Sequence, residues 1–189
     1  MKRIVILGVA LVASFSLVAV DAISVSASGD EFVASKTGKV KSKASGAQKF
    51  KTSAGTIECT EVSGSSEITE LKSVTHKEVL TFGGCIGFGS SITISTAYLE
   101  LNANGSAKLE KRVTIKPEGA GCDVLIEPQT LEHFGYSNEP ASKVTVELNL
   151  SKIHSKGTGG SCGSSENTEG SYTGTIVSEL EGGTVEWKS

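Results

Sequence analysis

Residues 144–150 read Val-Thr-Val-Glu-Leu-Asn-Leu, an unbroken alternation of apolar and polar side chains. Successive side chains of a β-strand point to opposite faces, so this alternation places the four hydrophobes on one face. The segment is therefore predicted to be a strand with one buried face. Similar period-two patterns, rich in β-branched residues, run through the segments Ile92–Ile94, Leu109–Ile115 and Tyr172–Leu180.

Residues that favour turns separate the predicted strands at 104–105, 116–119, 138–140 and 182–183. Asn104-Gly105 is the strongest hairpin signal, because both residues tolerate positive φ. Only Glu67–Leu80 has apolar residues at helical spacing, and its second half fits a strand equally well, which is the assignment we favour. Many short strands without amphipathic helices predict an all-β fold, either an antiparallel β-sandwich or a barrel-like fold.

The N-terminus has the layout of a secretory signal peptide. A positively charged start, Met1–Arg3, precedes the apolar run Ile4–Val20, and small and polar residues follow. Ser14 and Ser16 interrupt the run, which falls short of the ~20 apolar residues that a membrane span needs. We therefore expect the segment to be removed, and we expect no stable membrane span after its removal.

Cleavage is expected after Ala22 or Ala27. With the later site, residues 1–27 form the signal peptide and residues 28–189 form a single β-rich domain, a length that suits one domain. The mature protein is expected to be secreted. The chain has a formal net charge of −3, and this weakly acidic balance argues against nucleic acid as a partner, because phosphate contacts need a broad basic face.

Lysines are concentrated in an N-terminal segment of the expected domain, residues 36–51. Within it Lys39, Lys41 and Lys43 alternate with other residues, so on a strand they share one face. One interpretation is an edge strand that lysine protects from aggregation. The other is electrostatic contact with an anionic polymer of the cell envelope.

The chain has four cysteines, Cys59, Cys85, Cys122 and Cys162. No two of them have the Cys-x-x-Cys spacing of zinc ribbons or redox motifs, which argues against metal binding and thiol exchange. In an exported protein they are expected to form two disulfides. Four cysteines allow three pairings, and their spacing alone does not choose among them.

Short motifs spread over most of the expected mature chain carry a family resemblance. They are Phe32-Val33-Ala34, Gly84-Cys85 with Phe88-Gly89, Gly121-Cys122-Asp123-Val124, Tyr136-Ser137-Asn138 and Tyr172-Thr173-Gly174. With these motifs the chain resembles a group of secreted, functionally unassigned β-rich proteins of actinobacteria. The resemblance implies an all-β fold with sequential bridges, Cys59 to Cys85 and Cys122 to Cys162. Members of that group often have another cysteine pair between Cys85 and Cys122, and this chain has none there.

One segment imitates a catalytic motif. Residues 159–163 read Gly-Gly-Ser-Cys-Gly and match the G-x-S-x-G nucleophile elbow, but no histidine or aspartate follows Ser161 to complete that hydrolase order. The order His76, Asp123, Ser161 imitates a chymotrypsin-type triad, although the Gly-Asp-Ser-Gly surroundings of that family are missing. We therefore assign no catalytic residue. A secreted serine-type hydrolase that uses Ser161 with His76 or His154 is kept as an alternative.

No metal or cofactor site is expected, because His76, His133 and His154 lie far apart and show no paired ligand spacing. The leading interpretation is a non-catalytic extracytoplasmic β-domain that acts as a structural, surface or binding module of unknown ligand. A small-ligand carrier is a further alternative, if the strands close into a barrel with a pocket. A cavity of at least ~300 Å³ with converging polar groups would favour ligand binding over a purely structural role.

Overall fold

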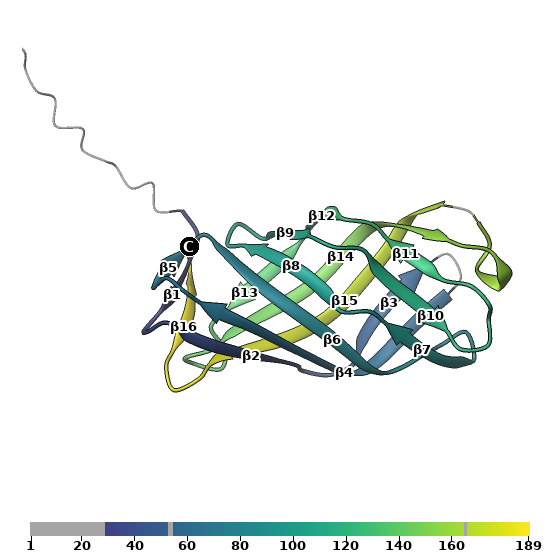
Figure 1. The fold of residues 1–189 in the computed structure, drawn as a ribbon. Coiled ribbons are helices and arrows are strands. Elements are labelled where there is room, and N and C mark those ends of the chain that lie inside the picture. Colours follow the sequence, from purple (N-terminus) through teal and green to yellow (C-terminus); the bar gives the residue numbers. More distant parts are fainter. Residues whose placement is uncertain (1–28, 53–54, 165) are drawn as a thin grey trace, which may run out of the picture.

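The structure is a computed structural model that describes residues 29–52, 55–164 and 166–189. Within these ranges every regular element is a strand except one 3₁₀ turn, Gly160–Cys162 (Figure 1). The all-β prediction is confirmed, and Glu67–Leu80 contributes strands rather than a helix. The predicted signal peptide, residues 1–27, lies outside the described residues.

Thirteen strands form one large antiparallel sheet, and three form a small one. The strands of the large sheet are β2 (Gly38–Ala44), β3 (Gln48–Thr52), β4 (Gly55–Ile68), β6 (Thr75–Gly87), β7 (Ser90–Ile94), β8 (Ala97–Asn102), β9 (Ser106–Leu109), β10 (Val113–Pro117), β11 (Val124–Ile126), β12 (Gln129–Glu132), β13 (Phe134–Ser137), β14 (Val144–Gly157) and β15 (Glu166–Leu180). The strands of the small sheet are β1 (Glu31–Ala34), β5 (Lys72–Ser73) and β16 (Val185–Lys188).

The large sheet closes on itself. Its ladder runs from β4 through β6, β7, β10, β11, β14 and β15, and it returns to β4 through β2 and β3. Strands β8, β9 and β12 extend it beside β6, and β13 pairs with β14. Of the two predicted arrangements, the closed ladder therefore selects the barrel-like fold rather than the sandwich (Figure 1).

Inward-facing apolar side chains, placed by the alternation along the strands, fill the inside of the barrel. In β14 the buried residues include Val144, Val146, Leu148 and Leu150, which are the four hydrophobes of the stretch 144–150. Together with apolar side chains of the other strands they leave a void of only about 50 Å³ in the middle of the barrel. The interior is thus a packed core over most of its length, as expected of a small barrel.

Both disulfides are present, and all four cysteines are bonded. Cys59–Cys85 joins residues that face each other across β4 and β6, and Cys122–Cys162 ties the loop before β11 to the 3₁₀ turn. The pairing is the sequential one that the family resemblance implies. Two disulfides are consistent with an extracellular or otherwise oxidising environment.

The small sheet lies at one end of the barrel, together with the C-terminus (Figure 1). Strand β1 lies between β16 and β5. Several hydrogen bonds attach this sheet to the loops at that end; for example, Ala34 N donates to Leu71 O at 2.8 Å, and Trp187 Nε1 donates to Ala103 O at 2.9 Å. This end of the barrel holds the candidate site.

Candidate functional site

A cavity of about 380 Å³ lies at the end of the barrel beside the small sheet. Apolar side chains form one part of its wall: Phe32 and Val185 from the small sheet, Leu101 from β8, and Val144 and Val146 from β14. These residues face inward because of the alternation along their strands. The cavity therefore offers an apolar surface to whatever occupies it.

The polar part of the wall centres on β6. His76 and Glu78 are alternate residues of this strand, so both point inward, with Glu78 one interior position deeper. His76 lines the cavity, and its Nε2 lies 2.8 Å from Ser66 Oγ and 3.5 Å from Glu78 Oε2. The hydroxyl of Ser66 is thus the close partner of the imidazole, and the carboxyl group of Glu78 is a more distant neighbour.

Glu78 is only 3% exposed, and within the described residues neither of its carboxyl oxygens has a hydrogen-bond partner. A buried polar group without a partner is costly, which is why most such groups in folded proteins are hydrogen-bonded. Glu78 therefore departs from the pattern of a purely structural interior. It lies next to the cavity, one interior position deeper than His76.

Gly64 of β4 makes room for this carboxyl group. A Cβ at residue 64 would collide with Glu78 Oε1 and would also come within 2.9 Å of Ser42 Cβ. Ser42 Oγ in turn lies 2.8 Å from Oγ of Ser178, which lines the cavity. Carboxyl and hydroxyl groups from β6, β2 and β15 thus gather on one side of the barrel interior.

An aromatic group lies next to the cavity. The ring of Phe32 is 6.1 Å from that of His76 and packs edge-on against Tyr136 at 5.2 Å. Tyr136 Oη donates to Asn102 O at 3.0 Å, and burial raises the pKa of this phenol. The ring of Trp187 lies 5.9 Å from Tyr136, so the single tryptophan reports on this end of the barrel.

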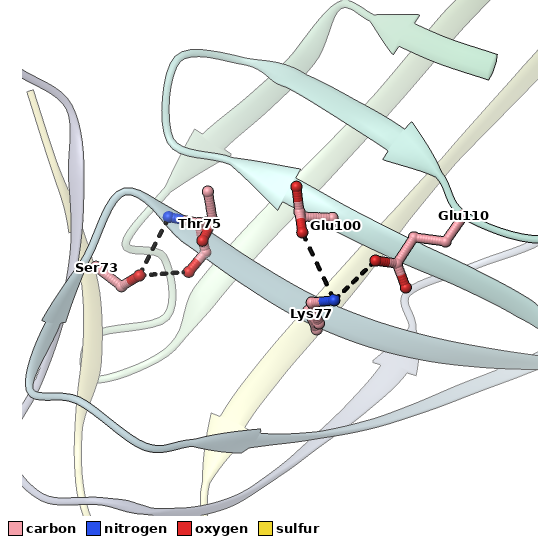
Figure 2. A network of polar contacts seen from close by, with 5 residues as sticks. All are labelled: Ser73, Thr75, Lys77, Glu100 and Glu110. Atoms are coloured by element: carbon pink, nitrogen blue, oxygen red, sulfur yellow. Dashed lines mark hydrogen bonds and ion pairs between the residues drawn. The ribbon is translucent and has the colours of Figure 1, made fainter. Parts of the chain in front are cut away.

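Lys77 lies between the two inward-facing residues of β6 but carries its charge on the outer face. Figure 2 shows its Nζ between Glu100 of β8 and Glu110, at 3.7 and 2.8 Å. The hydrogen bond with Glu110 raises the pKa of Lys77 and lowers that of Glu110. Figure 2 also shows Ser73, whose hydroxyl bonds to the backbone N and O of Thr75 and so shapes the start of β6.

The end of β4 and the segment that follows it border the cavity. Glu67 of β4 and Glu70 line it, whereas Leu71 and Val74 are exposed apolar side chains. The cavity is thus bordered by two further carboxylates beside an apolar surface.

The residues of the imitated triad do not come together. His76 lies near the start of β6 at the cavity end, whereas Cys162, next to Ser161, is bonded to Cys122 at the opposite end of the barrel (Figure 1). Asp123 does lie near the turn, because its neighbour Cys122 is bonded to Cys162 and its backbone N donates to Thr158 Oγ1 at 3.0 Å. The side chain of Ser161 lies outside the described part of the structure.

The predicted lysine stripe is on β2, with Lys39, Lys41 and Lys43 exposed and Val40 and Ser42 buried. The interpretation of this stripe as an edge strand is wrong, because β2 pairs with β15 on one side and with β4 on the other. Which strands flank a segment depends on long-range pairing, and local alternation does not reveal it. Contact of these lysines with an anionic polymer stays a prediction.

Sequence reasoning missed Glu78 and Gly64. A signal was present, because Glu78 interrupts an otherwise apolar or aromatic register of inward-facing residues, His76, Leu80 and Phe82. Gly64 carried no such signal, since only the packing of β4 against β6 shows that a carboxyl group occupies the place of its side chain.

Across residues 29–52, 55–164 and 166–189, no group of three or more His, Cys, Asp or Glu side chains is placed to hold a metal ion. In the same ranges no helix has the length and apolar character needed to cross a membrane. The fold and the site thus define a disulfide-bonded antiparallel β-barrel with a partly polar cavity at one end. No protein-family model, curated protein or solved structure matches the chain.

Proposed function

We propose that this chain is an exported, non-catalytic binding module that holds a small, partly apolar molecule in the cavity at the end of the barrel. The observation that carries the proposal is a cavity of about 380 Å³ whose wall joins an apolar surface to His76, Ser178 and the neighbouring buried Glu78. Ligand sites in proteins typically have this make-up: a concave space of about 300–1,000 Å³, mostly apolar, with a few placed polar groups.

The packing of the barrel supports one binding compartment. Apolar side chains fill its middle and leave about 50 Å³, so a ligand would occupy the end cavity rather than the whole lumen. The carboxyl group of Glu78, which has no hydrogen bond among the described residues, lies beside that cavity and not in the packed middle. Gln48, by contrast, is fully buried and hydrogen-bonded to Thr175 O and Tyr172 Oη.

Export is part of the proposal. The charged start and apolar run at the N-terminus favour it, and the two disulfides suit an oxidising compartment. A purely structural or surface role predicts no saturable binding of small molecules.

The test uses the full chain produced in an exporting host and a panel of C6 to C10 linear amines, alcohols and carboxylates. We expect at least one class to bind saturably by calorimetry and to raise the melting temperature. Val144→Phe fills the cavity from β14, opposite Ser178, and should abolish that binding. Val177→Phe makes the same change on the outer face of β15 and should preserve it.

Binding that survives Val144→Phe in a folded variant would place the ligand elsewhere. If no member of the panel binds the parent protein, the proposal is wrong.

A further inference from the structure

Glu78 does not itself line the cavity but lies one interior position deeper on β6 than His76, which does. Both oxygens of Glu78 are buried without a hydrogen bond among the described residues, on the same inward face of β6 as His76. The hydroxyl of Ser178 lines the cavity, and its partner Ser42 flanks the Gly64 position over which the carboxyl group lies. Two carboxyl oxygens and two hydroxyl groups therefore lie on this side of the barrel interior.

The basic side chains nearest to the cavity already have other partners. His76 Nε2 lies 2.8 Å from Ser66 Oγ, and Lys77 contacts Glu100 and Glu110 on the outer face. Lys72 of β5 donates to Glu31 at 3.1 Å. None of these groups hydrogen-bonds to Glu78, although His76 is 3.5 Å away.

Glu67 and Glu70 line the border of the cavity, and Lys39 is the cross-strand neighbour of Glu67 on β2. Lys77 also lines the cavity, but its ammonium group contacts Glu100 and Glu110. Among the lining residues two carboxyl groups stand against one lysine, which favours an incoming cation over an anion.

We infer that the ligand of the end cavity is a small molecule with an apolar body and a protonated primary amine, and that the amine pairs with the carboxyl group of Glu78. This inference rests on the proposed function. A primary ammonium group has three donors and no acceptor, which complements the two carboxyl oxygens and the hydroxyl of Ser178. Its apolar body would lie against Phe32, Leu101 and Val146, which line the same cavity.

The experiment compares three probes of one chain length, n-hexylammonium, n-hexanol and n-hexanoate, by titration calorimetry at pH 7 on the full chain from an exporting host. We expect hexylammonium to bind at least about tenfold more tightly than hexanol, the size of effect that a hydrogen bond to a charged group provides. Hexanoate should bind most weakly, because its carboxylate only accepts hydrogen bonds and brings no donor to Glu78.

Glu78→Gln should weaken hexylammonium binding by at least about tenfold and leave hexanol binding nearly unchanged. Glu110→Gln removes one carboxylate from the outer face and is the matched control, which should keep the preference for the amine. The near-ultraviolet circular dichroism of Trp187 shows whether each variant is folded. If Glu78→Gln does not fold, the ranking of the three probes on the parent protein decides the question.

Hexanol that binds as tightly as hexylammonium, or a preference for the amine that survives in folded Glu78→Gln, would overturn this inference and leave the proposed cavity function intact. Failure of all three probes and of the wider panel would instead remove the proposed function itself, and the amine inference with it.

Discussion

Two buried polar side chains, Gln48 and Glu78, show opposite behaviour at the scale of single residues. Gln48 is fully buried, and its Nε2 donates to Gly46 O and Thr175 O while its Oε1 accepts from Tyr172 Oη at 2.8 Å. Satisfied in this way, Gln48 acts as a structural link among β3, β15 and the turn before β3. Glu78 has no such bonds, and we therefore assign it to binding rather than to stability.

The first prediction concerns Gly174 of β15. A Cβ at this residue would collide with the side-chain amide of Gln48, so Gly174→Ala should break the bonds of a fully buried group. We expect a loss of about 2–3 kcal/mol in the free energy of unfolding, measured by urea denaturation. Gly135→Ala is the control, since the nearest atom to its added Cβ, Glu147 Cβ, would lie at 3.5 Å. Equal effects of the two substitutions would contradict the structural role of Gln48.

The second prediction concerns pH. Burial raises the pKa of Tyr136 and of Tyr172, so both phenols stay protonated in the folded protein above the ordinary tyrosine pKa of about 10. A raised folded-state pKa contributes stability that is fully present below the unfolded pKa and is lost as the pH rises. The free energy of unfolding should therefore fall above about pH 10.

An alkaline titration that follows tyrosinate absorbance and near-ultraviolet circular dichroism together checks this prediction. Ionisation of Tyr136 should accompany loss of the fold, and Tyr136→Phe should remove its share of the absorbance change. Ionisation of both phenols in a protein with intact circular dichroism would show that they are not buried as described.

At the scale of elements, β2 shows how alternation and neighbours act together. Its alternation sends Val40 and Ser42 inward and the three lysines outward. Both flanking strands carry acidic residues: Lys39 is paired in register with Glu67, and Lys41 with Glu179. Lys41 also forms an ion pair with Glu181 at 2.5 Å, which raises the pKa of the lysine and lowers that of the glutamate. Because β2 is paired on both sides, protection of a sheet edge no longer explains this lysine stripe.

The third prediction is that the stripe Lys39, Lys41 and Lys43 attracts anionic polymers of the cell envelope. Binding of the protein to purified cell walls should fall sharply between low and high salt, because salt screens attraction between exposed charges. Changing the three lysines together to Gln should reproduce the effect of high salt. Lys116, Lys156 and Lys188, each in an exposed ion pair elsewhere, give a control triple with the same change of net charge. If both triples sediment with walls equally, the stripe is only a solvated face.

At the scale of the whole molecule, the barrel has two structurally different ends. The bridge Cys122–Cys162 lies at one end with the loop before β11, and the cavity lies at the other beside the small sheet (Figure 1). Closure of the ladder pairs strands that would otherwise form sheet edges, and the two bridges close loops of 26 and 40 residues. We therefore expect that a change at the bridged end lowers the stability of the fold without changing binding in the cavity at the other end.

The fourth prediction tests this separation with the double variant Cys122→Ser, Cys162→Ser. Loss of a bridge that spans 40 residues should lower the free energy of unfolding by about 3–4 kcal/mol in the chain-entropy model. The affinity for the panel compound that binds best should change by less than about twofold, since the cavity lies at the opposite end. A large loss of affinity in the folded double variant would mean that the two ends are coupled.

The sequence by itself determined the all-β class, the buried face of strands such as residues 144–150, and the presence of two disulfides. These properties follow from period-two alternation, turn residues and cysteine count, which are local signals. The pairing of the four cysteines is the one that the family resemblance implies, and no rule of spacing predicted it.

Only the tertiary structure decided that the sheet closes into a barrel and that β2 has a paired strand on each side. It also decided that Glu78, Gly64 and Ser178 lie near one another beside a cavity. Each depends on the pairing of distant segments, such as Val40 with Leu180. Alternation predicts which way a side chain points but not which strand pairs with its own, because every strand with an apolar face has the same local pattern. Packing of all the faces at once selects the partners, and that selection created the cavity.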